Sequence, residues 1–160
     1  MIKGEPILIL LVEDDLAHAE IIRRHLGPLR VANRMVHVSD GLEAMDYLFR
    51  INSYSDPATS PKPDLILLDL RMPKMDGLEL LQRIKAVDEL KRIPTVVLTT
   101  SDAESDIVKA YDLGTSSYLV KPVDFEKFTG LMESFGLYWL EWNVYPTDEK
   151  IQGSTLRSNV

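Results

Sequence analysis

The 160-residue sequence contains no cysteine. A chain without thiols can form neither a disulfide nor a thiolate metal site, and we expect it to lie in the cytoplasm. The sequence also lacks an apolar run of the roughly 18 to 20 residues that a membrane-spanning helix needs, so no membrane partner is expected. Positive charge is scarce, since 18 lysines and arginines oppose 25 acids, and the formal net charge of −7 argues against non-specific binding to nucleic acid.

The chain does contain five short apolar segments that read as strands. They lie at residues 7–12, 35–38, 65–69, 95–98 and 118–120. Each is followed by apolar residues at helical spacing, over residues 16–26, 42–49, 78–84, 103–113 and 124–142. Because parallel strands need crossover connections, this alternation predicts an α/β fold with a parallel five-stranded sheet between two layers of helices.

This pattern fills one domain, expected at residues 5–142, with a C-terminal tail at 143–160 and no output domain. Residues 52–62 interrupt it with a polar stretch rich in serine and proline. A stretch of this length without secondary structure is unusual inside a compact domain, so we expect an inserted surface loop.

Polar side chains stand where four of the predicted strands end. Asp69 ends a buried run, and Glu13, Asp14, Thr99 and Lys121 occupy the corresponding positions of other strands. In open α/β sheets, chemistry gathers at the carboxyl ends of the strands. Three carboxylates brought together repel one another unless a cation lies between them, and oxygen ligands suit Mg²⁺. This equipment fits phosphoryl transfer to an aspartate, which would form an acyl phosphate.

Four segments carry a resemblance to a known family. The sequence reads Val-Glu-Asp-Asp from Val12, Leu-Leu-Asp-Leu-Arg-Met-Pro-Lys-Met-Asp-Gly from Leu67, Val-Leu-Thr-Thr from Val97 and Tyr-Leu-Val-Lys-Pro-Val from Tyr118. Through these segments the chain resembles the receiver domains of two-component response regulators. The resemblance extends over residues 7–135. The resemblance implies a flavodoxin-like (βα)5 fold with strand order 2-1-3-4-5, and a histidine kinase as the source of phosphate.

The resemblance also implies a role for each site residue. Asp69 would be the phosphoacceptor, with Mg²⁺ as cofactor. The metal would be held by Asp14 directly, by Glu13 through water and by the backbone carbonyl of Arg71.

On the other side of Asp69, Thr99 and Lys121 would bind the phosphoryl oxygens, and Tyr118 would act as an aromatic switch. The bond between Lys121 and Pro122 would be cis. Such a protein is a signalling protein and not an enzyme, apart from its part in its own phosphorylation and dephosphorylation.

Two further features resemble a narrower group, the stand-alone response regulators of cyanobacterial phytochrome histidine kinases. These features are the insert at 52–62 and the ending Phe-Gly-Leu-Tyr-Trp-Leu-Glu-Trp-Asn-Val-Tyr-Pro, which starts at Phe135. The resemblance implies a phytochrome-like kinase as the partner.

The last predicted helix carries more bulky apolar residues than one packed stripe requires. A homodimer is therefore expected through the helix 103–113, the strand 118–120 and the helix 124–142. Its interface residues would be Leu131, Tyr138, Trp139 and Trp142. In the alternative interpretation, these aromatic residues fold back on the body of their own chain.

Two other functions compete with the receiver interpretation. A flavodoxin-like nucleotide- or flavin-binding protein would share the fold, but no loop after a predicted strand carries a glycine-rich phosphate-binding pattern. A transcription factor would need a DNA-binding domain, and no helix-turn-helix fits after Trp142, so direct DNA binding is not expected.

Overall fold

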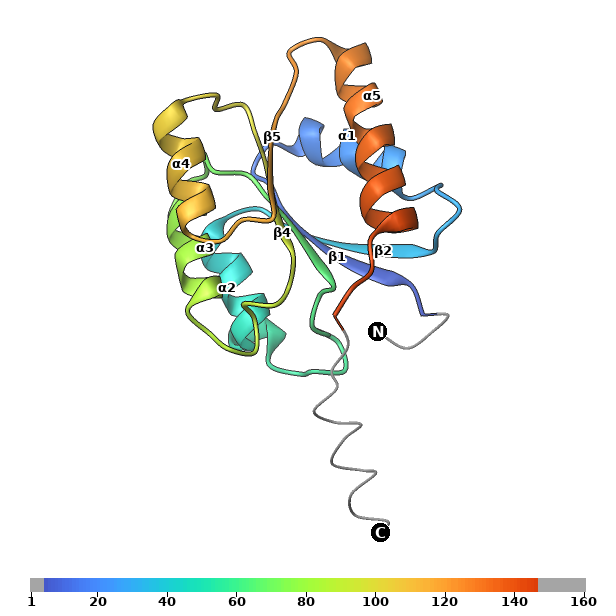
Figure 1. Ribbon diagram of the computed structural model, residues 1–160. Helices are drawn as coiled ribbons and strands as arrows, with labels where there is room; N and C mark the ends of the chain where they lie inside the picture. Colours follow the sequence, from blue (N-terminus) through green and yellow to red (C-terminus); the bar gives the residue numbers. More distant parts are fainter. Residues whose placement is uncertain (1–4, 147–160) are drawn as a thin grey trace.

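A computed structural model describes residues 5–146 of the chain (Figure 1). Five parallel strands form one sheet in the order β2-β1-β3-β4-β5. They are β1 (Ile7–Val12), β2 (Asn33–Val38), β3 (Leu65–Leu68), β4 (Thr95–Thr99) and β5 (Ser117–Val120). The predicted fold class and strand order are confirmed.

Helices cover both faces of this sheet. The α-helices are α1 (Leu16–Leu26), α2 (Gly41–Phe49), α3 (Gly77–Lys85), α4 (Glu104–Asp112) and α5 (Phe125–Gly136). Two shorter helices are η1 (Asn52–Tyr54), a 3₁₀ turn, and η2 (Leu137–Trp142), a π-helical segment that continues α5. α1 and α5 lie against one face, and α2, α3 and α4 against the other (Figure 1). None of the helices within residues 5–146 is long and apolar enough to cross a bilayer.

The alternation of side chains along β1 divides the core into two clusters. Ile9 and Leu11 pack with α1 and α5, whereas Leu10 and Val12 pack with α2 and α3. Because successive residues of a strand point to opposite faces, a fully apolar strand is what a sheet covered on both sides requires.

Aspartate caps begin four of the five α-helices. The side chains of Asp15, Asp40, Asp76 and Asp124 each accept a backbone N–H in the first turn of α1, α2, α3 and α5. Such caps satisfy amides that have no partner within the helix. Each cap therefore starts its helix close to the carboxyl edge of the sheet, where the candidate site lies.

The predicted insert is anchored on α2. The ring of Tyr54 packs edge-on against Tyr47 at 5.2 Å between centroids, and its hydroxyl donates to Glu43 Oε1 at 2.7 Å. The Tyr47 hydroxyl donates to the carbonyl of Pro61 at 2.7 Å, and Ser60 is buried. The insert therefore packs against the domain.

The end of the described chain differs from the sequence expectation. One continuous helix was predicted to Trp142, but the α-helix ends at Gly136 and a π-helical segment follows. Tyr145 then folds back, is buried and donates from its hydroxyl to the carbonyl of Trp139 at 2.6 Å. The core thus includes one residue of the segment expected to be a tail, while residues 147–160 of that tail lie outside the described residues.

Candidate functional site

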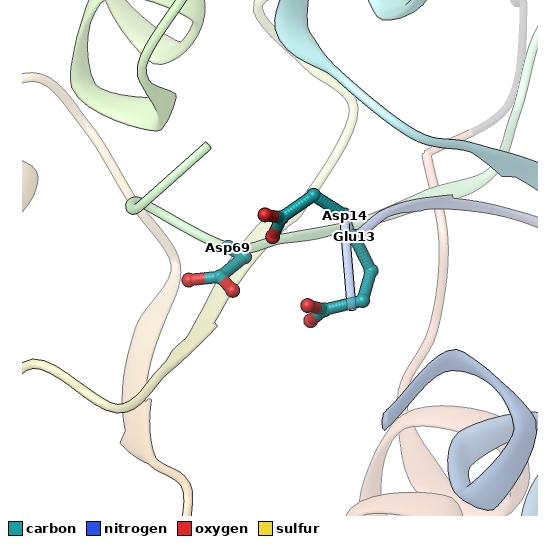
Figure 2. Close-up of side chains that lie close together, drawn as sticks. All are labelled: Glu13, Asp14 and Asp69. Atoms are coloured by element: carbon teal, nitrogen blue, oxygen red, sulfur yellow. The ribbon is translucent and has the colours of Figure 1, made fainter. Parts of the chain in front are cut away.

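Three carboxylates meet at the carboxyl edge of the sheet. Glu13 and Asp14 follow β1 directly, and Asp69 follows β3. Val12 and Leu68 are paired across these strands, and the Asp69 N–H donates to the Val12 carbonyl at 3.0 Å. One ligand oxygen from each of the three carboxylates lies within 4.8 Å of the others (Figure 2). The structure therefore brings together the carboxylates predicted to bind metal.

The three carboxylates differ in exposure. Glu13 and Asp69 are buried, whereas Asp14 is exposed. Burial raises the pKa of Glu13 to about 7, the charge of Asp69 adds to this, and Lys121 offsets part of it. Oxygen-only donors with one open side suit a hard divalent cation that keeps some of its water. The residues present therefore fit a divalent metal, which would relieve the repulsion among the carboxylates.

Lys121 lies within this cluster. Its buried ammonium donates to Glu13 Oε2 at 2.5 Å and to Asp69 Oδ2 at 3.2 Å. A third contact, which sequence reasoning missed, joins Lys121 Nζ to His18 Nδ1 at 3.0 Å. His18 lies on α1 and Lys121 follows β5, and no spacing in the sequence marks a contact between side chains 103 positions apart.

Thr99 and Tyr118 are held by different hydrogen bonds. Thr99 is fully buried at the end of β4, and its carbonyl accepts the Lys121 N–H at 2.7 Å. Tyr118, on the edge strand β5, is half-buried, and its hydroxyl donates to the carbonyl of Ser101 at 2.8 Å. Burial raises the pKa of Tyr118. The backbone thus holds Thr99 next to Lys121, while Tyr118 contacts the loop that follows Thr99.

Arg71 connects the site to α4. Its backbone N–H donates to Asp69 Oδ1 at 3.3 Å, and its guanidinium pairs with Asp106 Oδ2 at 2.5 Å. Sequence reasoning missed Asp106, because an acid in the first turn of a helix is ordinary and nothing in the pattern marks its partner.

The peptide bond between Lys121 and Pro122 was expected to be cis, and this expectation is wrong. No peptide bond in residues 5–146 is cis. The trans form is the intrinsically favoured isomer of an X–Pro bond. Lys121 reaches Glu13 and Asp69 with this bond in the trans form.

The residues expected at a dimer interface divide into two groups. Tyr138 and Trp142 are exposed, but Trp139 is 8% exposed and packs against Phe135 and Tyr138. The expectation that Trp139 lies at a dimer interface is therefore wrong, because Trp139 is buried in the core cluster that also contains Phe135 and Tyr145. A cavity of about 300 Å³ opens between β5 and α5, with Leu131, Tyr138 and Trp139 among its lining residues.

Most of the chain is similar to proteins of one known family. The model of the response regulator receiver domain matches residues 9–133. The probable methanogenesis regulatory protein FilR2 of Methanothrix harundinacea is 43% identical over 142 residues, which are 89% of each chain.

The response regulator Rcp1 of Synechocystis is 39% identical over 90% of this chain and 96% of its own. The crystal structure of its Mn²⁺-bound form superposes with a TM-score of 0.85, covering 89% of this chain and 100% of that one. The crystal structure of the phosphorylated cyanobacterial phytochrome response regulator RcpA has a TM-score of 0.84 at 40% identity, with coverage of 89% and 100%.

Proposed function

Because the chain belongs to the response regulator receiver domain family, we propose that it accepts a phosphoryl group from a histidine kinase onto Asp69. The observation that carries this proposal is the cluster of Asp69, Glu13 and Asp14, with Lys121 paired to Glu13 and Asp69. In such a cluster the carboxylate of Asp69 can act as the nucleophile. A metal ion and the fixed ammonium of Lys121 can then stabilise the negative charge of the phosphoryl group during its transfer.

In the proposed reaction, an oxygen of Asp69 attacks the phosphorus of a phosphohistidine. The new P–O bond forms as the P–N bond breaks, and the imidazole leaves with its electron pair and takes up a proton. Lys121, which contacts Asp69 Oδ2 at 3.2 Å, remains beside the incoming phosphoryl oxygens. Thr99, held next to Lys121 through its carbonyl, offers its hydroxyl to another oxygen.

We assign the metal to Asp14, Asp69 and the backbone carbonyl of Arg71, with Glu13 acting through water, and we propose Mg²⁺ as the physiological ion. Bound there, the metal would neutralise phosphoryl oxygens and balance the carboxylates. A relative of this chain has been crystallised with Mn²⁺, which supports a divalent site of this kind.

The proposed kinase is phytochrome-like, since one relative at 40% identity is a cyanobacterial phytochrome response regulator. The exchange would take place in the cytoplasm, where the kinase has ATP.

Thr99 and Tyr118 would transmit the presence of the phosphate to the face formed by α4, β5 and α5. We propose that this face makes a homodimer through Leu131, Tyr138 and Trp142, and that output passes through protein contacts and not through DNA.

Phosphotransfer tests this proposal. A phytochrome-like kinase is phosphorylated with radiolabelled ATP, freed of nucleotide and mixed with the protein in the presence of Mg²⁺. Label is expected to move to the wild type and not to Asp69→Asn. Asp76→Asn is the matched control, because it changes the same residue type on the loop after β3 and keeps a capping side chain. Equal labelling of wild type and Asp69→Asn would exclude Asp69 as the acceptor.

The alternative of a nucleotide- or flavin-binding protein gains no support. The carboxyl edge of the sheet carries acids after β1 and β3, and these repel a phosphate that arrives without a metal. The family match covers the same strands.

A further inference from the structure

One ion pair joins the candidate site to the helix α4. The Arg71 guanidinium lies 2.5 Å from Asp106 Oδ2, with relative exposures of 66% for the Arg71 side chain and 10% for that of Asp106. Arg71 follows Asp69 by two positions, while Asp106 lies in the first turn of α4. The pair therefore spans from the loop after β3 to the face on which a receiver signal would be read.

Asp106 also organises the loop between β4 and α4. The same Oδ2 atom accepts from the Ser101 hydroxyl at 2.6 Å, and the carbonyl of Ser101 accepts from the Tyr118 hydroxyl at 2.8 Å. A continuous polar chain thus runs from Arg71 through Asp106 and Ser101 to Tyr118. The N-cap residue of α4, Ala103, makes no side-chain cap bond, and the buried Asp106 carboxylate supplies a side-chain tie between the first turn and the loop.

Arg71 is as well placed for a phosphoryl group as it is for Asp106. Its backbone nitrogen lies 3.3 Å from Asp69 Oδ1, and an N–Cα bond of about 1.46 Å puts its Cα within about 5 Å of that carboxylate. The exposed side chain can turn without disturbing the core. A phosphoryl group on Asp69 would carry about −1.5 to −2 charges and three acceptor oxygens, against the single charge of Asp106. Arginine binds such a group through two parallel hydrogen bonds.

We propose that Asp106 is a positioning residue, which holds Arg71 away from the phosphoryl site until Asp69 is phosphorylated. The phosphoryl oxygens then take the guanidinium from Asp106, and the first turn of α4 loses its tie to the loop after β3. This inference rests on the proposed function of Asp69.

The release has a direct consequence for Tyr118. Once Arg71 has left, the Asp106 side chain keeps one side-chain hydrogen bond within residues 5–146, the bond from the Ser101 hydroxyl. The loop that carries Ser101 is then less restrained. The hydrogen bond from Tyr118 to the Ser101 carbonyl depends on that loop. Arg71 and Asp106 thus give a side-chain route from the phosphate to α4 and β5, additional to any movement of Thr99.

Beryllofluoride with Mg²⁺, a stable mimic of the phosphoryl group, tests the proposal by titration followed with amide NMR. Asp106→Asn frees Arg71, so it is expected to bind the mimic about five-fold or more tightly than wild type. Arg71→Gln is expected to bind it more weakly, and the double variant should match Arg71→Gln alone. Glu20→Gln is the matched control, because it removes one acid from the exposed pair with Arg24 on α1.

Amide hydrogen exchange in α4 distinguishes this release from a general loss of packing in Asp106→Asn. Beryllofluoride should speed exchange in the first turn of α4 in wild type and add nothing in Asp106→Asn. An effect of Asp106→Asn that persists in the Arg71→Gln background would overturn the proposal. Unchanged binding of the mimic by Arg71→Gln would also overturn the proposal. Because Arg71 is exposed, this variant still tests the proposal if Asp106→Asn fails to fold. Failure of the wild type itself to bind the mimic would overturn the proposed function as well.

Discussion

Lys121 and Glu13 form a buried ion pair across the carboxyl edge of the sheet, although 108 residues separate them in the sequence. Nζ lies 2.5 Å from Oε2, and both side chains are 1% exposed. In the same pocket, Lys121 is the cation that balances Glu13 and Asp69. One buried ammonium group therefore pairs with two of the three carboxylates of the candidate site.

Replacing Lys121 with methionine should destabilise the metal-free protein. Breaking a buried pair from one side leaves an unpaired buried charge, at a cost of about 3 to 5 kcal/mol. Urea unfolding measures the change, and the double variant Lys121→Met/Glu13→Gln should recover much of it. A free energy of unfolding equal to that of wild type would show that the pair contributes nothing.

A divalent metal should stabilise the wild type. At a Mg²⁺ concentration 100 times its dissociation constant, the gain is about 2.7 kcal/mol. Asp14→Asn should lose this gain, because it removes the exposed ligand of the cluster, yet its metal-free stability should not fall. Thermal unfolding over a Mg²⁺ series checks both points. An equal rise in Tm for Asp14→Asn would contradict the assignment of the metal.

Two glycines make a matched pair for the backbone around Asp69. A Cβ at Gly77 would lie 2.3 Å from the Asp69 carbonyl oxygen, so Gly77→Ala must displace the backbone of the site. Overpacking of this kind costs about 1 to 3 kcal/mol. Gly130 has no such neighbour within 4 Å and lies inside α5, so Gly130→Ala should stabilise by about 0.5 to 1 kcal/mol. Chemical denaturation measures the free energy of unfolding of both variants. A change in the same direction for both would contradict this prediction.

The two tryptophans at the end of the chain should respond differently to truncation. Trp139→Ala removes a core side chain and should cost about 3 to 5 kcal/mol of stability. Trp142 is 74% exposed, so Trp142→Ala should leave the stability of the monomer almost unchanged and weaken the proposed dimer. Sedimentation velocity combined with urea unfolding separates these effects. If Trp142→Ala has the same dimer content as wild type, Trp142 does not contribute to the interface.

Tyr145 should make the protein sensitive to alkaline pH. Burial raises its pKa well above the usual value, and the charge of Asp64 adds to the rise. As the pH passes about 10, tyrosine in the unfolded chain loses its proton while folded Tyr145 keeps it. The folded state then binds more protons, so stability falls as the pH rises.

Tyr145→Phe is the control for this dependence. It loses the hydrogen bond to the Trp139 carbonyl and about 1 kcal/mol at neutral pH. Between pH 9 and about 11, however, its stability should fall less steeply than that of wild type. Parallel slopes in urea unfolding across this range would contradict the role given to Tyr145.

The sheet and the cluster of carboxylates were predictable because they depend on local patterns. Apolar runs marked β1 and β3, and a carboxylate directly after a parallel strand must lie at the carboxyl edge. Asp69, Glu13 and Asp14 follow from that rule without knowledge of any side-chain conformation. The strand order itself came from the resemblance to receiver domains and not from the periodicity.

Contacts between side chains from distant elements were not predictable. The pairs of Lys121 with His18 and of Arg71 with Asp106 depend on helix rotation and on rotamers, which no sequence spacing encodes. Trp139 is buried in the same core cluster as Tyr145, and the turn after η2 that brings the Tyr145 hydroxyl to the Trp139 carbonyl is a tertiary contact that the helical pattern does not encode.

The position of the phosphate on the chain decides whether Asp69 is the acceptor. After phosphotransfer, the acyl phosphate is reduced with tritiated borohydride, and the labelled peptides are sequenced. The account predicts homoserine at position 69 and no label elsewhere. Label at Glu13 or Asp14, or a phosphoprotein with none at Asp69, would contradict it.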